Sequence, residues 1–399
     1  MGDRYKFNRM ELAGSFGDLG TLLPLSMGMI MINGLSPSGL FFSIGLFYIL
    51  SGFYYGITVP VQPMKVIGAY AIATAINPSQ IAASALLAGI FLLVAGGTGI
   101  ITFVGRHMPK SVVRGLQMSA GTLLMAEGVK FVAGSSKYQL LQGLAEPYLG
   151  IQEIKTIPVG IIIGIVSCII TFLFLNSRKM PAGLLVILFG IILGLISGVH
   201  DGFDTLKPGV YFPEPLPFGF PARVDLTVAL VVLVLPQLPM TFGNAVIANA
   251  DLSRDYFGKA SERVTYRSLC LSMGLANLFC FFVGGMPLCH GAGGLAAHYR
   301  FGARTAGSNL MIGLIFMALA IFLGPHAIAI IKLIPFSALG ILLVFAGSQL
   351  ALAVIDIKER KDFFVILVML GITLALNLAV GFIIGIAVAY ALKSEKLNI

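Results

Sequence analysis

Gln62 and Lys65 stand beside two prolines in the stretch VPVQPMKVIGAYA, residues 59–71, inside a strongly apolar part of the chain. Pro60 and Pro63 forbid a continuous helix, because proline lacks an N–H and disfavours helical geometry in the residue before it. The stretch therefore predicts an extended piece followed by a helix that begins near Pro63. The free N–H groups at such a helix start, including that of Val66, together with the Lys65 ammonium, favour an anion.

A second stretch, GGMPLCHGAGG at residues 284–294, has the same character. It predicts an extended segment through Leu288 and a half-helix that begins within the cluster of small residues. We expect the backbone of Gly291, Ala292 and Gly293 to approach the anion. His290 is either a hydrogen-bond donor to an oxyanion, a group that titrates near neutrality, or a partner of backbone carbonyls only.

Further polar residues lie within apolar segments. Gln237 and Asn244 are seven residues apart, so on a helix they share a face directed at the same cavity or at a neighbouring helix. Thr21 is a candidate ligand of the anion, with a hydrogen bond to its own helix as the alternative. Asp18 and Glu127 are candidate proton sites for coupling, and ion pairing with a neighbouring span is the alternative for both.

Lys65 and Gln62 have alternatives as well, namely capping the broken helix or, for the lysine, snorkelling to the membrane surface. Lys65 lies too deep in its segment for an easy exit, and a lysine in a membrane span is usually functional. Cys289 and His290 do not make a metal site, because adjacent residues without further Cys or His nearby give no tetrahedral set. The sequence predicts neither a metal nor a cofactor.

The elements that must position these residues are membrane spans. Of 399 residues, 57% are hydrophobic and 11% are charged, and the mean hydropathy is +0.95, which indicates an integral membrane protein. Apolar runs predict an all-α protein of fourteen transmembrane segments, several of them too short to cross as whole helices. The net charge of +9 comes from basic residues scattered over the loops, so we expect no nucleic-acid partner.

The distribution of basic residues predicts the orientation. With a cytoplasmic N-terminus, nineteen of the 26 Lys and Arg fall in inside loops and six in outside loops, and Lys65 alone lies within a span. Cytoplasmic loops are enriched in Lys and Arg, so both termini are predicted to be cytoplasmic. Seven segments before the polar stretch at residues 200–225 and seven after it make two inverted repeats, in which the broken segments, spans 3 and 10, correspond. Paired broken segments of this kind indicate a transporter's binding site.

Four motifs together resemble a known family. PVQPMKVIGAYA at residues 60–71 and GGMPLCHGAGGLAAHYRFGART at residues 284–305, with FGDLGTLLPL and NADLSRD, resemble the molybdate transporter family of the sulfate permease superfamily. The resemblance implies a core of spans 1–4 (residues 1–105) and 8–11 (206–330), and a gate of spans 5–7 (106–205) and 12–14 (331–399). It also implies an oxyanion bound between spans 3 and 10 and carried by an elevator-like movement of the core.

The sequence thus predicts a secondary active transporter of a tetrahedral oxyanion in the plasma membrane, not an enzyme. Molybdate is the first candidate, sulfate and tungstate the next, with a proton as a co-substrate and membrane lipid as the surroundings. The alternatives are a nucleobase or bicarbonate carrier of the same fold, an anion channel, or a membrane-embedded enzyme that uses His290 with Asp251 or Asp255. Sequence alone leaves the coupling ion and the oligomeric state open, a homodimer included.

Overall fold

The computed structural model describes residues 4–99, 108–154, 156–175, 177, 181–198 and 206–393, and nearly all of its regular structure is helical. The first half contains α1 (Arg9–Ser15), α2 (Leu19–Met31), α3 (Pro37–Tyr55), β1 (Gln62–Pro63), α4 (Lys65–Thr74), α5 (Pro78–Thr98), α7 (Lys110–Ala133), α8 (Lys137–Gln142), β2 (Glu153–Ile154), β3 (Ile157–Pro158), α9 (Val159–Phe174) and α10 (Ala182–Ser197).

The second half begins with one long, irregular helix and continues with a series of shorter ones. The long helix consists of α11 (Arg223–Val228), the π-helical η1 (Ala229–Val234), α12 (Leu235–Met240), the π-helical η2 (Thr241–Ala248), α13 (Asn249–Phe257) and η3 (Gly258–Ser261). There follow α14 (Tyr266–Val283), β4 (Leu288–Cys289), α15 (Ala292–Phe301), α16 (Ala306–Ala318), η4 (Leu319–Leu323), η5 (Gly324–His326), α17 (Ala327–Lys332), α18 (Phe336–Ala351), η6 (Leu352–Asp356), α19 (Arg360–Ala375) and α20 (Leu378–Ala391).

Six helical stretches in the described part of the chain are long and apolar enough to cross a membrane. They are Pro37–Tyr55, Pro78–Thr98, Arg223–Ser261, Tyr266–Val283, Ala306–Lys332 and Phe336–Asp356. Five further apolar helices are shorter, among them α2 and α4. The protein is therefore a mostly helical, multi-pass membrane protein, as its composition predicts.

The expected breaks in spans 3 and 10 are present, and the two broken segments meet. β1 pairs antiparallel with β4, so that Gln62 faces Cys289 and Pro63 faces Leu288. Each strand leads into a helix of ten residues, which is about 15 Å long and half the thickness of a bilayer's hydrocarbon core. The first half-helix begins at Lys65 rather than near Pro63, because Pro63 belongs to the strand pair.

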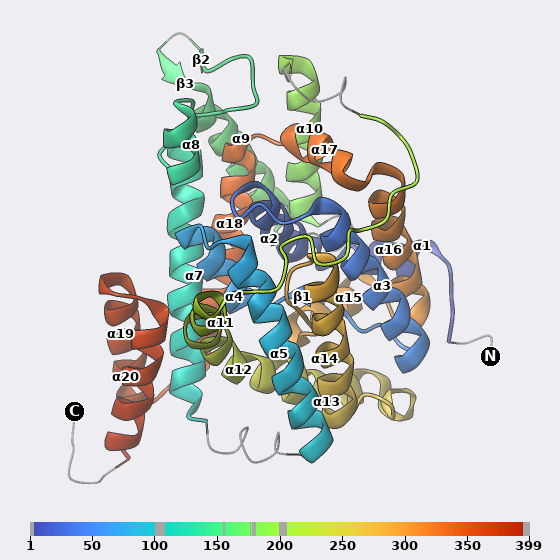
Figure 1. Ribbon diagram of the computed structural model, residues 1–399, viewed down its shortest axis with the longest axis vertical. Coiled ribbons are helices and arrows are strands. Elements are labelled where there is room, and N and C mark those ends of the chain that lie inside the picture. The colour runs from blue at the N-terminus through green and yellow to red at the C-terminus, as the bar shows by residue number, and fades with distance from the viewer. Residues whose placement is uncertain are drawn as a thin grey trace.

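The remaining helices pack in pairs around this centre. α3 packs against α16, α5 against α14, and α7 against α18, and Figure 1 shows α5 beside α14 and α19 with α20 at the edge beyond α7. Close backbone approach makes the α7–α18 contact possible: a Cβ on Gly121 would collide with Gly347, and one on Gly128 with Gly340. Small residues at such positions let membrane helices approach each other.

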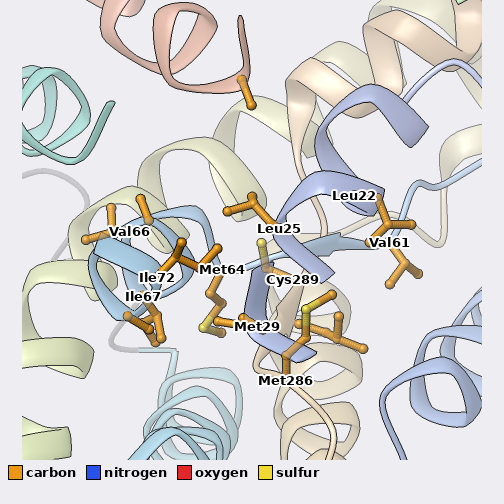
Figure 2. Packing of buried hydrophobic residues seen from close by; sticks show 14 of the residues in the cluster. Leu22, Leu25, Met29, Val61, Met64, Val66, Ile67, Ile72, Met286 and Cys289 are labelled. Carbon is orange, nitrogen blue, oxygen red and sulfur yellow. The ribbon is translucent and has the colours of Figure 1, made fainter. Parts of the chain in front are cut away.

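Apolar side chains fill the space around the β1–β4 pair. Leu25 and Met29 of α2, Met64 just before α4, Ile67 within α4, and Met286 before β4 are all buried, and Figure 2 shows their side chains around α2, the start of α4 and the short strands. This packing holds the two half-helix starts in the interior of the protein.

The segment between α7 and α9 is anchored by one buried carboxyl group. Glu146 accepts hydrogen bonds from the backbone N–H groups of Phe336 (2.8 Å) and Ser337 (2.9 Å), and from the Ser337 hydroxyl. It therefore caps the start of α18, which has no side-chain cap from its own N-cap residue. Burial raises the pKa of Glu146 to about 7, against the lowering effect of these hydrogen bonds.

The predicted boundaries between core and gate can be placed on the helices. The predicted boundary at residue 330 falls inside α17, so a division between core and gate elements fits better in the loop at residues 333–335. The predicted boundaries at residues 105 and 205 lie outside the described residues.

Candidate functional site

A cavity of about 520 Å³ runs along the starts of the two half-helices. Five of the predicted site residues line it: Asp18, Thr21, Lys65, Asn244 and Gly293. They come from four elements that are far apart in the sequence, namely the start of α2, α4, η2 and α15. The strand pair and the breaks in the helices therefore bring these residues to one place.

Lys65 is the first residue of α4, is half-buried and lines the cavity. It forms no hydrogen bond and no ion pair within 4.0 Å with any residue that the structure describes. A lysine at this depth is expensive without a partner. It interacts electrostatically with the Asp18 carboxyl without a direct contact, so its N–H donors are available to an anion in the cavity.

The start of α15 also offers donors. Its N-cap, Gly291, provides no side-chain cap, and Leu295 N–H is the first to bond back, to the Gly291 carbonyl. The N–H groups of Ala292, Gly293 and Gly294 have no hydrogen-bond acceptor among the described residues. Such free groups carry the positive end of the helix dipole.

The start of α4 differs from this arrangement. The Gln237 side-chain oxygen accepts hydrogen bonds from the N–H groups of Val66 (2.9 Å) and Ile67 (3.3 Å), and its amide donates to Thr241 (2.9 Å). Gln237 and Val66 do not line the cavity. Gln237 and the Val66 N–H, both predicted to contact an anion, therefore contact each other. Lys65 is the residue of α4 that lines the cavity.

Asp18 organises the neighbouring polar groups. One carboxyl oxygen accepts a hydrogen bond from Gln62 Nε2 (2.6 Å), and the other accepts one from the Thr21 hydroxyl (2.7 Å). Gln62 is buried in β1 and does not line the cavity, and its Oε1 accepts no hydrogen bond from the residues that the structure describes. Gln62 thus connects β1 to α2, and Asp18 is the group of this network that reaches the cavity.

His290 is held away from the cavity. The fully buried ring lies with Nδ1 2.8 Å from the Pro60 carbonyl oxygen and Nε2 3.2 Å from the Ser272 hydroxyl. Because a carbonyl only accepts, Nδ1 carries the proton and Nε2 accepts. Of the readings that the sequence left open, the bond to a backbone carbonyl is the one present. His290 connects β4 to the extended segment before β1.

Glu127 lies elsewhere, on α7. It is buried, forms an ion pair with Lys130 one turn further along (3.2 Å), and does not line the cavity. The ion pair lies within α7, whereas the alternative predicted for Glu127 is an ion pair with a neighbouring span. Asp18 is consequently the predicted coupling candidate that faces the cavity.

Two asparagines that sequence reasoning missed hold the extended backbone. Asn309 of α16 accepts from the N–H of Val59 (3.1 Å) and donates to its carbonyl (2.7 Å). Asn277 of α14 does the same for Leu288 (3.0 and 2.7 Å). Backbone that is not helical needs such partners at membrane depth. The sequence signal for this role is an asparagine within an apolar segment, as at Asn277 and Asn309.

Comparison with known proteins identifies the family. The family described as "Molybdate transporter of MFS superfamily" matches residues 10–124 and 229–350, more than half of the chain. The chain belongs to the molybdate transporter family. A curated relative, Molybdate transporter 1 of Arabidopsis thaliana, is 30% identical over 94% of this chain and 86% of its own length. Members of this family are transporters, and the protein is a transporter rather than an enzyme.

Solved structures with the same fold come from anion transporters. The transmembrane domain of the cyanobacterial bicarbonate transporter BicA has a TM-score of 0.67 and 16% identity, and covers 97% of this chain and 98% of that one. The murine Solute Carrier 26 family member A9 anion transporter, solved in the inward-facing state, has a TM-score of 0.68 and 17% identity. The match covers 98% of this chain and 69% of the murine chain. At these identities the likeness establishes the fold alone.

Proposed function

We propose that this protein is a secondary active transporter of a tetrahedral oxyanion, with molybdate as the first substrate. The observation that carries the proposal is the cavity itself, where, among the described residues, Lys65 forms no hydrogen bond and no ion pair within 4.0 Å, and three N–H groups at the start of α15 have no acceptor. An oxyanion with several equivalent oxygens supplies acceptors for both. The curated relative named a molybdate transporter supports this choice of anion.

The substrate position follows from these donors. The oxyanion lies at the start of α15, against the N–H groups of Ala292 and Gly293, with the Lys65 ammonium on the other side. Asn244 completes the pocket as a further hydrogen-bond donor, while the Thr21 hydroxyl, which also lines the cavity, donates to Asp18. Gln62, Gln237, His290 and Gly291 position the two half-helices, and do not contact the substrate in this arrangement.

The movement proposed is of the elevator type, with two inverted repeats of seven spans. Its support is that contacts pair elements from opposite halves: α3 with α16, α5 with α14, and β1 with β4. The cavity lies between the elements assigned to the core, such as α4 and α15, and those assigned to the gate, α7, α9, α10 and α18. Sliding of the first set past the second would carry the site across the membrane.

Orientation and coupling complete the proposal. Away from the half-helices, the cavity reaches Arg114 near the start of α7, Leu175 after α9, Pro181 before α10 and Phe301 at the end of α15. The excess of Lys and Arg at these ends supports a cytoplasmic location, so we assign the cavity to an inward-facing state of a plasma-membrane protein with both termini inside. Asp18, next to the substrate position, is the proposed proton site.

The experiment is uptake of radiolabelled molybdate into proteoliposomes that contain the purified protein, driven by an inward proton gradient. We expect tungstate and sulfate to compete and uracil not to compete. Lys65→Ala should abolish uptake, while Lys332→Ala, a lysine outside the cavity lining, should retain it. Competition by uracil or bicarbonate without competition by tungstate would assign the protein to another substrate class. Absence of molybdate uptake in the wild type would overturn the proposal.

A further inference from the structure

A second basic side chain lines the cavity, at the end away from the half-helices. Arg114 of α7 stands there with Gln117, one turn further along the same helix. Among the described residues, Arg114, Lys65 and Asp18 are the charged members of the lining. An anion that leaves the position beside Lys65 in this direction therefore meets a further cation, Arg114.

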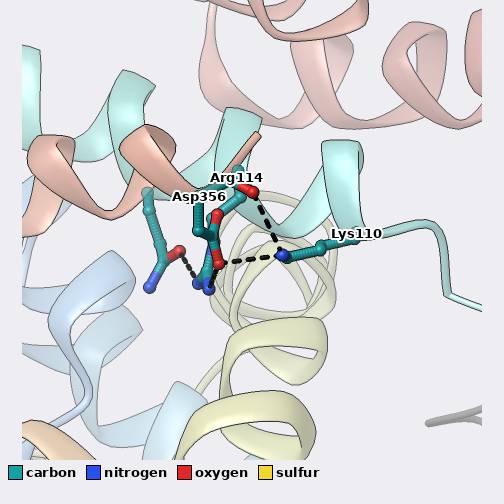
Figure 3. Close-up of polar contacts among 4 residues, drawn as sticks. Lys110, Arg114 and Asp356 are labelled. Carbon is teal, nitrogen blue, oxygen red and sulfur yellow. Dashed lines mark hydrogen bonds and ion pairs between the residues drawn. The ribbon is translucent and has the colours of Figure 1, made fainter. Parts of the chain in front are cut away.

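Arg114 is held by a carboxylate that belongs to another element. Its Nε and Nη2 atoms donate to the two oxygens of Asp356 at the end of η6 (2.9 and 2.5 Å), and its Nη1 donates to Gln117 Oε1 (2.8 Å). Lys110 also contacts Asp356, at 2.9 Å (Figure 3). Two cations thus share one carboxylate, and the group as a whole keeps an excess positive charge.

An oxyanion could bind Arg114 with the same geometry as the Asp356 carboxylate. A guanidinium donates two parallel N–H groups to two oxygens of one anion, and a tetrahedral oxyanion presents such a pair as a carboxylate does. The Asp356 side chain is 41% exposed and that of Arg114 is 24% exposed. The pair is partly exposed, so solvent and salt screen its attraction, and its bidentate geometry makes it stronger than a typical surface ion pair. Asp356 does not line the cavity, and an anion that takes its place on Arg114 must replace these hydrogen bonds.

We propose that Arg114, with Gln117 as its support, is a second oxyanion-binding position at the mouth of the cavity, and that Asp356 is a built-in counter-ion which the substrate displaces. This rests on the proposed function, since the ligand is the same oxyanion. Asp356 neutralises Arg114 while the position is empty, and the substrate takes its place on the way between the deep site and the cytoplasm.

A purely structural role for the pair gives a different expectation. If the ion pair only fastened η6 to α7, removing either partner would break the same contact, and both variants would change transport in the same direction. A competing counter-ion requires opposite directions. Loss of Arg114 weakens binding of the substrate, whereas loss of the Asp356 charge removes the competitor.

The experiment is molybdate self-exchange in proteoliposomes of the full chain, with KM and kcat measured for each variant. We expect Arg114→Gln to raise KM about tenfold, because a charge-assisted bidentate contact is lost, and Asp356→Asn to lower KM several-fold. Arg114→Lys, which keeps the charge but not the fork, should fall between wild type and Arg114→Gln. The matched control is Arg254→Gln, which breaks an exposed ion pair with Asp251 outside the cavity and should leave KM unchanged.

KM changes in the same direction for Arg114→Gln and Asp356→Asn, or no change for either, would overturn the inference while wild-type exchange left the proposed function intact. Absence of exchange in the wild type would instead be a failure of the proposed function. If Arg114→Gln does not fold, Asp356→Asn and Arg114→Lys still decide, because a KM for Asp356→Asn at or above that of the wild type contradicts displacement.

Discussion

Replacing Gly294 by alanine would place a methyl group against the Gln62 amide and the Asp18 carboxyl. A Cβ at Gly294 would lie 2.5 Å from Gln62 Nε2 and 2.8 Å from Asp18 Oδ2, whereas a Cβ at the neighbouring Gly293 meets nothing within 4 Å. The Gln62 side chain is buried, so it yields only by giving up its hydrogen bond to Asp18. Gly293→Ala therefore serves as the control for Gly294→Ala, because both add a methyl group to the first turn of α15 and only one of the two meets a neighbour.

The magnitude follows from that hydrogen bond. A hydrogen bond to a charged group contributes about 1.5–3 kcal/mol, and alanine in place of glycine in a helix gains about 1 kcal/mol in both variants. The free energies of unfolding of Gly293→Ala and Gly294→Ala should therefore differ by about 1.5–3 kcal/mol, or roughly 10- to 150-fold in the unfolding equilibrium constant.

The assay is unfolding of the purified variants in detergent micelles by increasing mole fractions of SDS, followed by circular dichroism. Gly293→Ala should unfold at or above the wild-type midpoint, and Gly294→Ala below it. Molybdate uptake gives a second readout, since the Gly293 methyl group projects into the cavity and should reduce uptake in a stable protein. Equal midpoints for the two variants would refute the assigned contact between Gly294 and Gln62.

Four further predictions follow from the same geometry. Lys65→Ala should weaken molybdate binding by about 2–5 kcal/mol in a scintillation proximity assay, and Lys65→Arg should not restore it; unchanged affinity would contradict a role for this ammonium. Asp18→Asn should abolish accumulation driven by a pH gradient but spare self-exchange, and continued accumulation would exclude Asp18 as the coupling site. The pKa of Glu146 is about 7 in the fold and 4.5 in the unfolded chain, so the folded protein holds a proton that the unfolded chain has lost. The free energy of unfolding should therefore fall as pH rises from about 4.5 to 7, by at most about 1.4 kcal/mol per pH unit. Glu146→Gln should remove this pH dependence from the thermal unfolding curve. Cysteines placed at residues 254–267 should react with membrane-impermeant maleimide only from the cytoplasmic side, and labelling from outside would invert the topology.

The sequence predicts the breaks in the helices because their causes are local. Pro60 and Pro63 block helical geometry where they stand, and the second half-helix starts at Ala292, inside the predicted cluster of small residues after His290. Lys65 is identifiable for a similar reason, since a lone charge in an apolar run is conspicuous whatever surrounds it. The cavity lining confirms that this residue and Asn244 share one space.

The sequence does not reveal which side chains from distant segments contact each other. Asn309 holds Val59 across 250 residues, and Gln237 caps α4 across 171. Whether a glutamine in an apolar span faces a ligand or another helix depends on packing between distant segments, not on its own neighbours. For the same reason His290, next to glycines in the sequence, lies behind the site, and Arg114, which the sequence does not single out, lines the cavity.

The most direct test of the central claim is to locate the substrate itself. Crystals of the protein grown with molybdate, with data collected at the molybdenum absorption edge, should give an anomalous difference peak between the Lys65 ammonium and the N–H groups of Ala292 and Gly293. Under higher molybdate concentration a weaker second peak should appear beside Arg114. A single strong peak outside the cavity, with Lys65 and the start of α15 unoccupied, would contradict the account.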